Sequence, residues 1–136
     1  RQGSMKNPHQ IGGGVAFAPK PRDYSYSIPK AKKRVALAVA LSVRNNEKSL
    51  KVVSNFEMAE GKTSLVNQTL SSLQMNSALV VDCENGNLKQ GIRNLPNAKY
   101  INVDGLNVYD ILHYPSLIMT KKAALAIEKR LVGESL

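Results

Sequence analysis

The sequence contains one cysteine, two histidines and no tryptophan, and aromatic residues make up only 5% of its 136 positions. Cys83 alone cannot form an internal disulfide, and with His9 and His113 it does not provide a ligand set for structural zinc. No apolar run approaches the roughly 18 residues that cross a bilayer. We therefore expect a soluble protein without a disulfide framework, a structural metal or a cofactor.

Acidic residues are scarce at one end of the chain, and this scarcity accounts for most of the net charge of +9. Residues 1–44 contain nine Lys or Arg and one acid, Asp23, whereas residues 45–136 contain ten basic and nine acidic side chains. One end is thus a polycation attached to a nearly neutral body. Such asymmetry indicates a polyanionic partner, either nucleic acid or an anionic membrane surface.

The nearly neutral part alternates between strand and helix patterns. Residues 50–54, 78–83, 99–103 and 117–119 are short, rich in β-branched residues and bounded by turn formers, which predicts four strands. Helical spacing of apolar residues predicts helices over 63–73, 85–94, 107–114 and 121–132. Strands separated by crossover helices imply a mostly parallel four-stranded sheet with helices on both faces. We predict a small three-layer α/β domain over residues 29–136.

A further helix is predicted over residues 30–44, at the start of this domain. Its second half has few polar positions, so we expect that half to be buried. Its first turn contains four cations, which oppose the helix dipole and are easier to understand if an external anion neutralises them. The four cations are Lys30, Lys32, Lys33 and Arg34.

Candidate catalytic residues are few. Asp82, Asp104 and Thr120 follow predicted strands, where ligands of open parallel sheets gather, which keeps a small doubly wound phosphate- or nucleotide-binding enzyme as an alternative. Simpler interpretations exist for each: Asp104 begins a turn, Thr120 is a helix N-cap and Asp82 closes a strand. His113 has no surrounding motif, and we interpret it as a structural or surface residue. We expect no enzyme.

Residues 1–28, here called the arm, have no apolar periodicity. Gly12, Gly13 and Gly14 match no phosphate-binding motif and follow no strand, but glycines allow close approach of the backbone, while the prolines stiffen the free chain. The scattered cations would displace counterions from a phosphate backbone, and Phe17, Tyr24 and Tyr26 offer rings that stack on bases. The arm is therefore predicted to bind RNA; the alternative is a solvated tail.

Two stretches carry a family resemblance that covers essentially all 136 residues. Residues 1–42, "RQGSMKNPHQIGGGVAFAPKPRDYSYSIPKAKKRVALAVALS", resemble half of the long loop and the following helix of the bacterial-type ribosomal protein L-four family of the large subunit. Residues 92–131, "IRNLPNAKYINVDGLNVYDILHYPSLIMTKKAALAIEKRL", show the matching C-terminal pattern. The resemblance implies an α/β body on the outside of the subunit and a basic extension that penetrates ribosomal RNA.

Further expectations come from the same resemblance. The loop tip would line a constriction of the peptide exit tunnel, with residues 1–4 just past the tip. Gln10 and Ile11 stand where the family usually has Trp followed by Arg, so one stacking ring and one cation are missing. The family's first third has no counterpart here, so we expect a piece of a longer or divided chain, with an exposed strand edge or an uncovered apolar face.

We interpret the chain as a non-enzymatic structural constituent of the large ribosomal subunit, in the bacterial cytoplasm or, as an alternative, in an organellar ribosome. Expected partners are large-subunit rRNA and neighbouring ribosomal proteins, not a membrane; the resemblance also permits binding to its own mRNA as an autoregulator. The residues expected to contact rRNA are Arg1, Gln2, Lys6, His9, Gly12, Gly13, Gly14, Lys20, Arg22, Tyr24, Tyr26, Lys30, Lys32, Lys33, Arg34 and Arg44.

Overall fold

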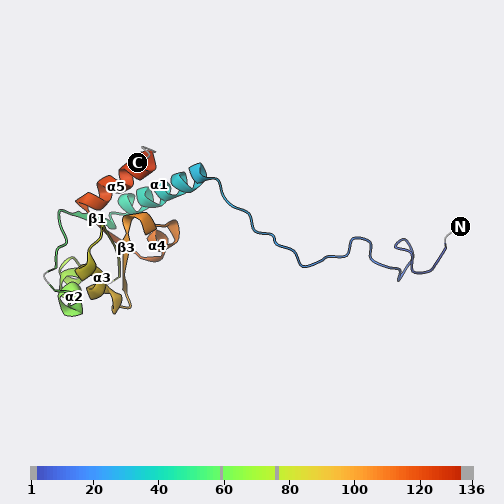
Figure 1. Cartoon of the computed structure of the whole chain (residues 1–136), viewed down its shortest axis with the longest axis horizontal. Helices are drawn as coiled ribbons and strands as arrows, with labels where there is room; N and C mark the ends of the chain where they lie inside the picture. Colours follow the sequence, from blue (N-terminus) through green and yellow to red (C-terminus); the bar gives the residue numbers. More distant parts are fainter. Residues whose placement is uncertain (1–2, 59, 76, 133–136) are drawn as a thin grey trace.

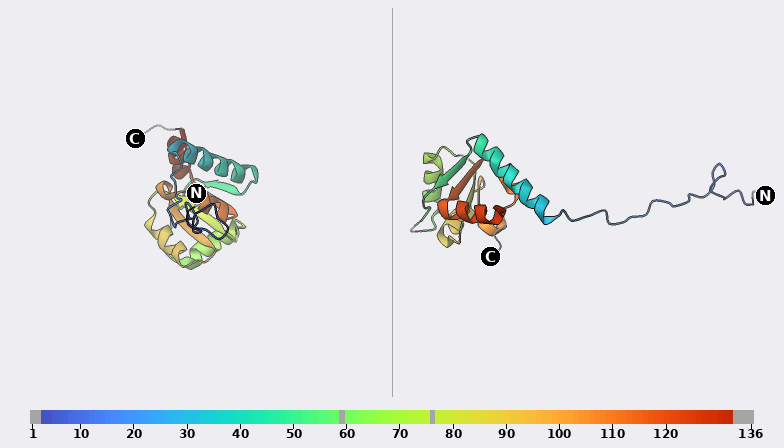
Figure 2. Two further views of the ribbon diagram at one scale, coloured as in Figure 1. Left: turned by 90° about the vertical axis from the view of Figure 1, so that its right-hand side faces the viewer. Right: turned by 90° about the horizontal axis from the view of Figure 1, so that it is seen from above.

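A computed structural model describes residues 3–58, 60–75 and 77–132. The chain begins as an extended segment that runs away from the rest of the molecule and enters a compact α/β body at α1 (Figure 1). The right-hand view of Figure 2 shows the same separation, and the left-hand view looks along the arm, which there lies in front of the body. The arm and the body are therefore described in turn.

The body is built on one sheet of four strands, all of them paired in parallel. Its spatial order is β1-β4-β2-β3, so β4 lies between β1 and β2 and the edges are β1 and β3. All four strand predictions are confirmed to within two residues. The strands are β1 (Leu50–Val53), β2 (Ala78–Asp82), β3 (Ala98–Asn102) and β4 (Ser116–Thr120).

Helices cover both faces of the sheet, which confirms the predicted three-layer α/β class. One face carries α1, α4 and α5, and the other carries α2 and α3. The buried residues of these two groups of helices belong to two separate hydrophobic clusters, one on each face. The elements are α1 (Lys30–Asn46), α2 (Thr63–Ser72), α3 (Gly86–Arg93), α4 (Val108–His113) and α5 (Lys121–Val132), with a 3₁₀ turn η1 (Val103–Gly105).

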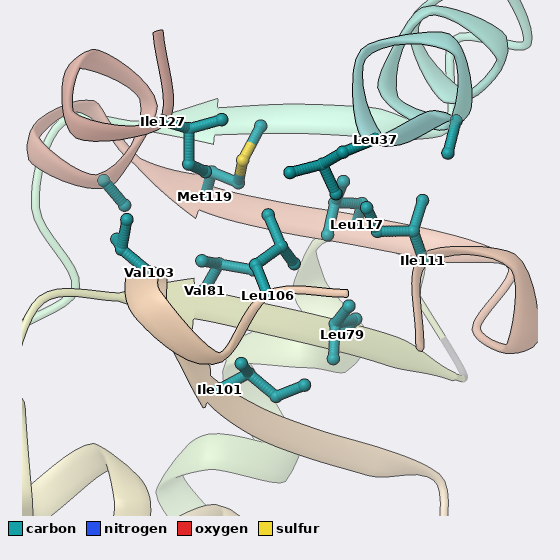
Figure 3. Packing of buried hydrophobic residues seen from close by; sticks show 12 residues of the cluster. Leu37, Leu79, Val81, Ile101, Val103, Leu106, Ile111, Leu117, Met119 and Ile127 are labelled. Carbon is teal, nitrogen blue, oxygen red and sulfur yellow. The ribbon is translucent and has the colours of Figure 1, made fainter. Parts of the chain in front are cut away.

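Strand β2 supplies both clusters. Because successive side chains of a strand point to opposite faces, Leu79 and Val81 enter the cluster under α1, α4 and α5, and Ala78 and Val80 enter the other. All five residues of β2 are buried. Figure 3 shows the first cluster, in which side chains of β2 and β4 meet Leu37 of α1 and the residues around η1.

Polar side chains directly before α3, α4 and α5 cap the first turns of these helices. The Asn85 and Asn107 side chains accept hydrogen bonds from the backbone amides of Leu88 (3.1 Å) and Asp110 (2.8 Å), and so cap α3 and α4. Thr120 Oγ1 accepts one from the Ala123 amide at 3.2 Å at the start of α5. These side chains satisfy amides that have no partner within the helix, and the predicted N-cap role of Thr120 is confirmed.

Helix α1 differs from its prediction. Leu37 and Ala40 are buried, but Val35, Val39 and Val43 are 63%, 56% and 39% exposed, so the second half of the helix is not buried as expected. The physical reason is that α1 meets its neighbours, α4 and α5, on one side only. The three valines recur every four residues and form an apolar stripe on the outer side.

The edge strand β1 adds to the exposed apolar surface. Val52 on β1 is 53% exposed, and β1 pairs only with β4. The body thus has an open strand edge at β1 and the apolar stripe of α1 on its surface; that they result from the absence of the family's first third stays a prediction. Within residues 3–58, 60–75 and 77–132 there is no helix both long enough and apolar enough to cross a membrane.

Candidate nucleic-acid interface

The arm has almost no contact with the body. Between residues 3 and 28 every residue is exposed except Asn7, Gln10 and Gly13, which are half-buried within the arm itself. The rings of Phe17, Tyr24 and Tyr26 are 105%, 72% and 87% exposed. Because the body buries none of these side chains, only local interactions hold the conformation of the arm.

A closed loop lies near the start of the arm. Backbone hydrogen bonds run from the amides of Asn7, Gln10 and Gly13 to the carbonyls of Ser4, Asn7 and Gln10, at 3.0–3.1 Å. A further bond of 2.9 Å, from the Gly14 amide to the Lys6 carbonyl, closes the loop. We call residues 4–14 the arm loop; no sequence motif predicted it.

Two glycines of the triplet, Gly12 and Gly13, are required by this arm loop. A Cβ atom at Gly13 would lie 2.0 Å from the Asn7 carbonyl oxygen, which no side chain can occupy, and Gly12 has a φ of +75°. Both positions therefore need glycine for local reasons. The glycines therefore shape the loop and are not a phosphate-binding motif. The predicted contact of Gly12, Gly13 and Gly14 with RNA would be made by the backbone of the loop.

The arm cations and the first turn of α1 form one continuous basic segment. Lys6, Lys20 and Arg22 are exposed on the arm, and Lys30, Lys32, Lys33 and Arg34, here called the basic turn, are exposed on α1. No carboxylate of residues 3–58, 60–75 or 77–132 lies within 4.0 Å of any of them. The segment therefore presents seven cations that the protein itself does not neutralise.

The start of α1 is electrostatically unfavourable in the isolated chain. Pro29 precedes the helix without a side-chain cap, and the first turn contains no acidic residue. Four cations at the positive end of the helix dipole raise the free energy of this turn, and an anion placed there would lower it.

Rings and cations are interleaved along the arm. The Arg22 guanidinium lies 4.7 Å from the centroid of the Tyr24 ring, a cation–π contact. Asp23 accepts hydrogen bonds from the Ser25 amide (2.9 Å) and hydroxyl (2.7 Å), and these bonds hold the pKa of Asp23 below its ordinary value. The one acid of the arm is thus hydrogen-bonded to Ser25. Tyr26 and His9 are exposed.

One predicted contact residue of the described part of the chain, Arg44, stands apart from the rest. The Arg44 guanidinium donates to the carbonyls of Ile111 and Leu112, both at 3.0 Å, and to the Glu47 carboxylate at 2.8 Å. Its side chain is only 13% exposed, so Arg44 joins α1 to the end of α4 instead of facing outward. Arg1 and Gln2 lie outside the described residues.

The carboxyl edge of the sheet is the place where an enzyme of this fold would hold its ligand. Asp82 is buried and accepts hydrogen bonds from the Thr120 hydroxyl (2.7 Å) and the Cys83 amide (2.8 Å). Asp104 is exposed in η1 and bonds to neither Asp82 nor Thr120. Asp82 and Thr120 therefore fasten β2 to the start of α5, and both have a structural role.

Nucleophilic and metal chemistry are also unsupported at this edge. Partial burial of the sulfur, followed by the charge of the Asp82 carboxylate, raises the pKa of the Cys83 thiol, so the reactive thiolate is scarce at neutral pH. His113 lies away from this edge, at the end of α4 just before the start of β4, where it is exposed and packs against the rings of Tyr109 and Tyr114. In the part of the chain that the structure describes, no group of three or more His, Cys, Asp or Glu side chains could hold a metal ion.

The molecule is thus a parallel α/β protein with a cationic extension. Residues 1–130 match the model of the ribosomal protein L4/L1 family. The chain belongs to this family, which confirms the resemblance and the non-enzymatic class that it implied.

Individual relatives agree with the family match. The chain is 44% identical over 133 residues to large ribosomal subunit protein uL4 of Desulfatibacillum aliphaticivorans, covering 97% of this chain and 65% of the relative. Identity to the proteins of the same name from Anaeromyxobacter dehalogenans and Lachnospira eligens is 41% and 42%, covering 96% and 95% of this chain and 64% and 63% of theirs. The chain therefore spans less than two thirds of the length of these bacterial relatives.

Proposed function

We propose that the chain is a non-enzymatic structural component of the bacterial large ribosomal subunit that binds large-subunit rRNA through its arm and its basic turn. The observation that carries the proposal is the set of seven exposed cations without carboxylate partners. The body serves as an anchor for this segment and touches neighbouring ribosomal proteins.

Charge neutralisation supplies most of the binding free energy in this proposal. Each lysine or arginine that meets a phosphate releases condensed counterions, so affinity falls steeply as salt rises. The basic turn adds helix-terminal amides that point at the same phosphates. The exposed rings of Phe17, Tyr24 and Tyr26 stack on unpaired bases and contribute about 1–3 kcal/mol per base.

The arm loop gives the arm its shape before RNA binds. Its four backbone hydrogen bonds and the prolines that follow lower the number of conformations lost on binding. With the arm directed inward, its first residues would lie toward the peptide exit tunnel, as the family resemblance implies. The same chemistry fits structured regions of the chain's own mRNA, so discrimination between the two RNAs has to come from their shapes.

The test compares two triple charge reversals. Lys32→Glu, Lys33→Glu and Arg34→Glu together should lower affinity for a large-subunit rRNA fragment by about 10²–10³-fold, because three favourable phosphate contacts become repulsive. The control reverses Lys89, Arg93 and Lys129, which are exposed on α3 and α5. Binding is measured by filter retention at a fixed salt concentration, and thermal unfolding reports the fold.

The control has the same net charge as the test variant, so it separates position from total charge. We expect the control to lose much less affinity than the test variant. Equal losses would contradict a defined interface, and no loss in either would contradict RNA binding through the basic turn. Competition with a fragment of the chain's own mRNA then measures how far the interface prefers rRNA.

A further inference from the structure

A groove of about 450 Å³ lies where four parts of the chain meet, at the root of the arm. Leu37 of α1, Leu106 and Val108 beside η1, and Leu131 of α5 supply its apolar lining. Ile28, the last residue of the arm, also lines it. The volume lies within the range of ordinary binding pockets.

The rim of this groove is basic. Lys32, Lys33 and Arg34 line it from α1, and Arg130 lines it from α5, whereas no acidic side chain does. The Arg130 guanidinium donates to the Val103 carbonyl at 2.8 Å, which holds it at the rim. None of the four cations has a carboxylate within 4.0 Å among the residues described here.

We propose that this groove binds an acidic amphipathic segment of a partner protein, which goes beyond RNA binding by the arm. Lys32, Lys33 and Arg34 belong both to the groove rim and to the basic turn, so the segment and rRNA compete for these three cations. The apolar side chains of the segment pack against the groove lining and are thereby removed from water. Its flanking carboxylates pair with the four cations of the rim. All four cations are exposed, so these pairs are screened by salt. Helix-in-groove docking between α1 and α5 is a recurrent mode of this kind.

Two other occupants fit the groove less well. A second copy of this chain has a net charge of +9 and would bring cations to a cationic rim. RNA would find no aromatic lining residue to stack on, and the one amide of the lining, Asn107, is occupied: its Nδ2 donates to Asp110 (2.8 Å) and its Oδ1 accepts from the Asp110 amide (2.8 Å).

The experiment uses a designed peptide as the probe. A labelled peptide of about 15 residues carries Leu at i, i+3, i+4 and i+7 and Glu on both flanks of that stripe. Its binding to the full chain is followed by fluorescence anisotropy. We expect saturable binding, weakened by salt, that is lost when the Glu residues are replaced by Lys and also when the Leu residues are replaced by Ser.

A pair of neutral substitutions on α1 locates the site. Ala36 is exposed and lines the groove, whereas Val35, next to it, is exposed and does not. Ala36→Gln places a long polar side chain in the groove and should weaken peptide binding by about tenfold, and Val35→Gln should leave it within about twofold of the original. Both sites are exposed, so both variants fold, and thermal unfolding verifies this.

Because neither substitution alters charge, rRNA binding should be the same in both variants. Absence of saturable peptide binding, or equal weakening by Ala36→Gln and Val35→Gln, would overturn the groove proposal and leave the proposed rRNA interface intact. If Ala36→Gln instead weakens rRNA binding and not peptide binding, the groove is a nucleotide site and the protein-partner proposal is wrong. Failure of the rRNA interface alone would appear as loss of RNA binding with peptide binding retained.

Discussion

The arm and the body differ in whether their charged side chains have partners within the protein. In the body, Lys99 pairs with Asp110 at 2.7 Å, Arg44 serves two carbonyls and a carboxylate, and Asp82 meets the Thr120 hydroxyl. Among the described residues of the body and arm, no buried side-chain nitrogen or oxygen is left without a hydrogen-bond partner. The arm instead keeps its cations exposed and unmatched.

This difference shows where each region finds its stability. The body is held by its own core, in which β2 is buried on both faces, and its charges complete that structure. The backbone hydrogen bonds of the arm loop join residues of the arm, and the rings of Phe17, Tyr24 and Tyr26 are exposed. Substitutions in the body should therefore change stability, and those in the arm should change binding.

The largest expected effect is in the core. Leu79 is completely buried in the cluster of Figure 3, so Leu79→Ala should lower the free energy of unfolding by about 2–5 kcal/mol. Phe17→Ala, on the arm, should leave it within about 0.5 kcal/mol. Chemical denaturation measures both, and a destabilising Phe17→Ala would mean that the arm folds together with the body.

The next effect concerns an ion pair of the body and acid pH. Burial alone would raise the pKa of the Asp110 carboxyl, but hydrogen bonds from Lys99 and Asn107 outweigh it and lower this pKa. Because the folded pKa is depressed, the stabilisation is complete above the unfolded value of about 3.9 and is lost as pH falls through the folded pKa. Asp110→Asn should destabilise by about 1–3 kcal/mol at neutral pH.

Urea denaturation at several pH values follows this difference. The gap between the original chain and Asp110→Asn should narrow as the pH falls below about 4. A gap that stays constant down to the lowest pH at which the chain folds would show that the carboxylate charge contributes nothing and that only the shape of the side chain matters.

A smaller effect distinguishes two arginines of the same helix. Arg44→Met removes hydrogen bonds to the end of α4 and should destabilise the body by about 1–2 kcal/mol, with rRNA affinity nearly unchanged. Arg34→Met should do the reverse, because the Arg34 side chain is exposed and makes no hydrogen bond or ion pair with another described residue. Chemical unfolding and rRNA binding are measured for both variants. A larger loss of rRNA binding in Arg44→Met than in Arg34→Met would contradict the structural role of Arg44.

The smallest effect concerns the arm loop. Gly13→Ala inserts a Cβ where the Asn7 carbonyl lies, which opens the loop, whereas Gly14→Ala meets the Lys6 carbonyl at 3.2 Å and needs only a small shift. Gly13→Ala should weaken rRNA binding by about three- to tenfold through lost preorganisation, with Gly14→Ala closer to the original. Equal affinities for all three chains would show that the loop shape does not matter for binding.

The sequence predicted the strands of the body better than it predicted how the elements pack against one another. The runs at residues 78–83 and 117–119 predicted strands because they are short, rich in β-branched residues and bounded by turn formers, but nothing in the sequence placed β4 between β1 and β2. The apolar second half of α1 suggested burial, yet burial requires a neighbour on each side, and spacing along the chain does not report neighbours. Arg44 has the same residue type as Arg34, and only the approach of α4 separates their roles.

Salt dependence of rRNA binding tests the central claim most directly, that the arm cations lie on phosphates. The intact chain is compared with a variant carrying Lys6→Gln, Lys20→Gln and Arg22→Gln and with a control carrying Lys89→Gln, Arg93→Gln and Lys129→Gln. The slope of log affinity against log salt should become shallower by about 2–3 in the arm variant and stay the same in the control. An unchanged slope in the arm variant, or an equal change in both, would contradict the account.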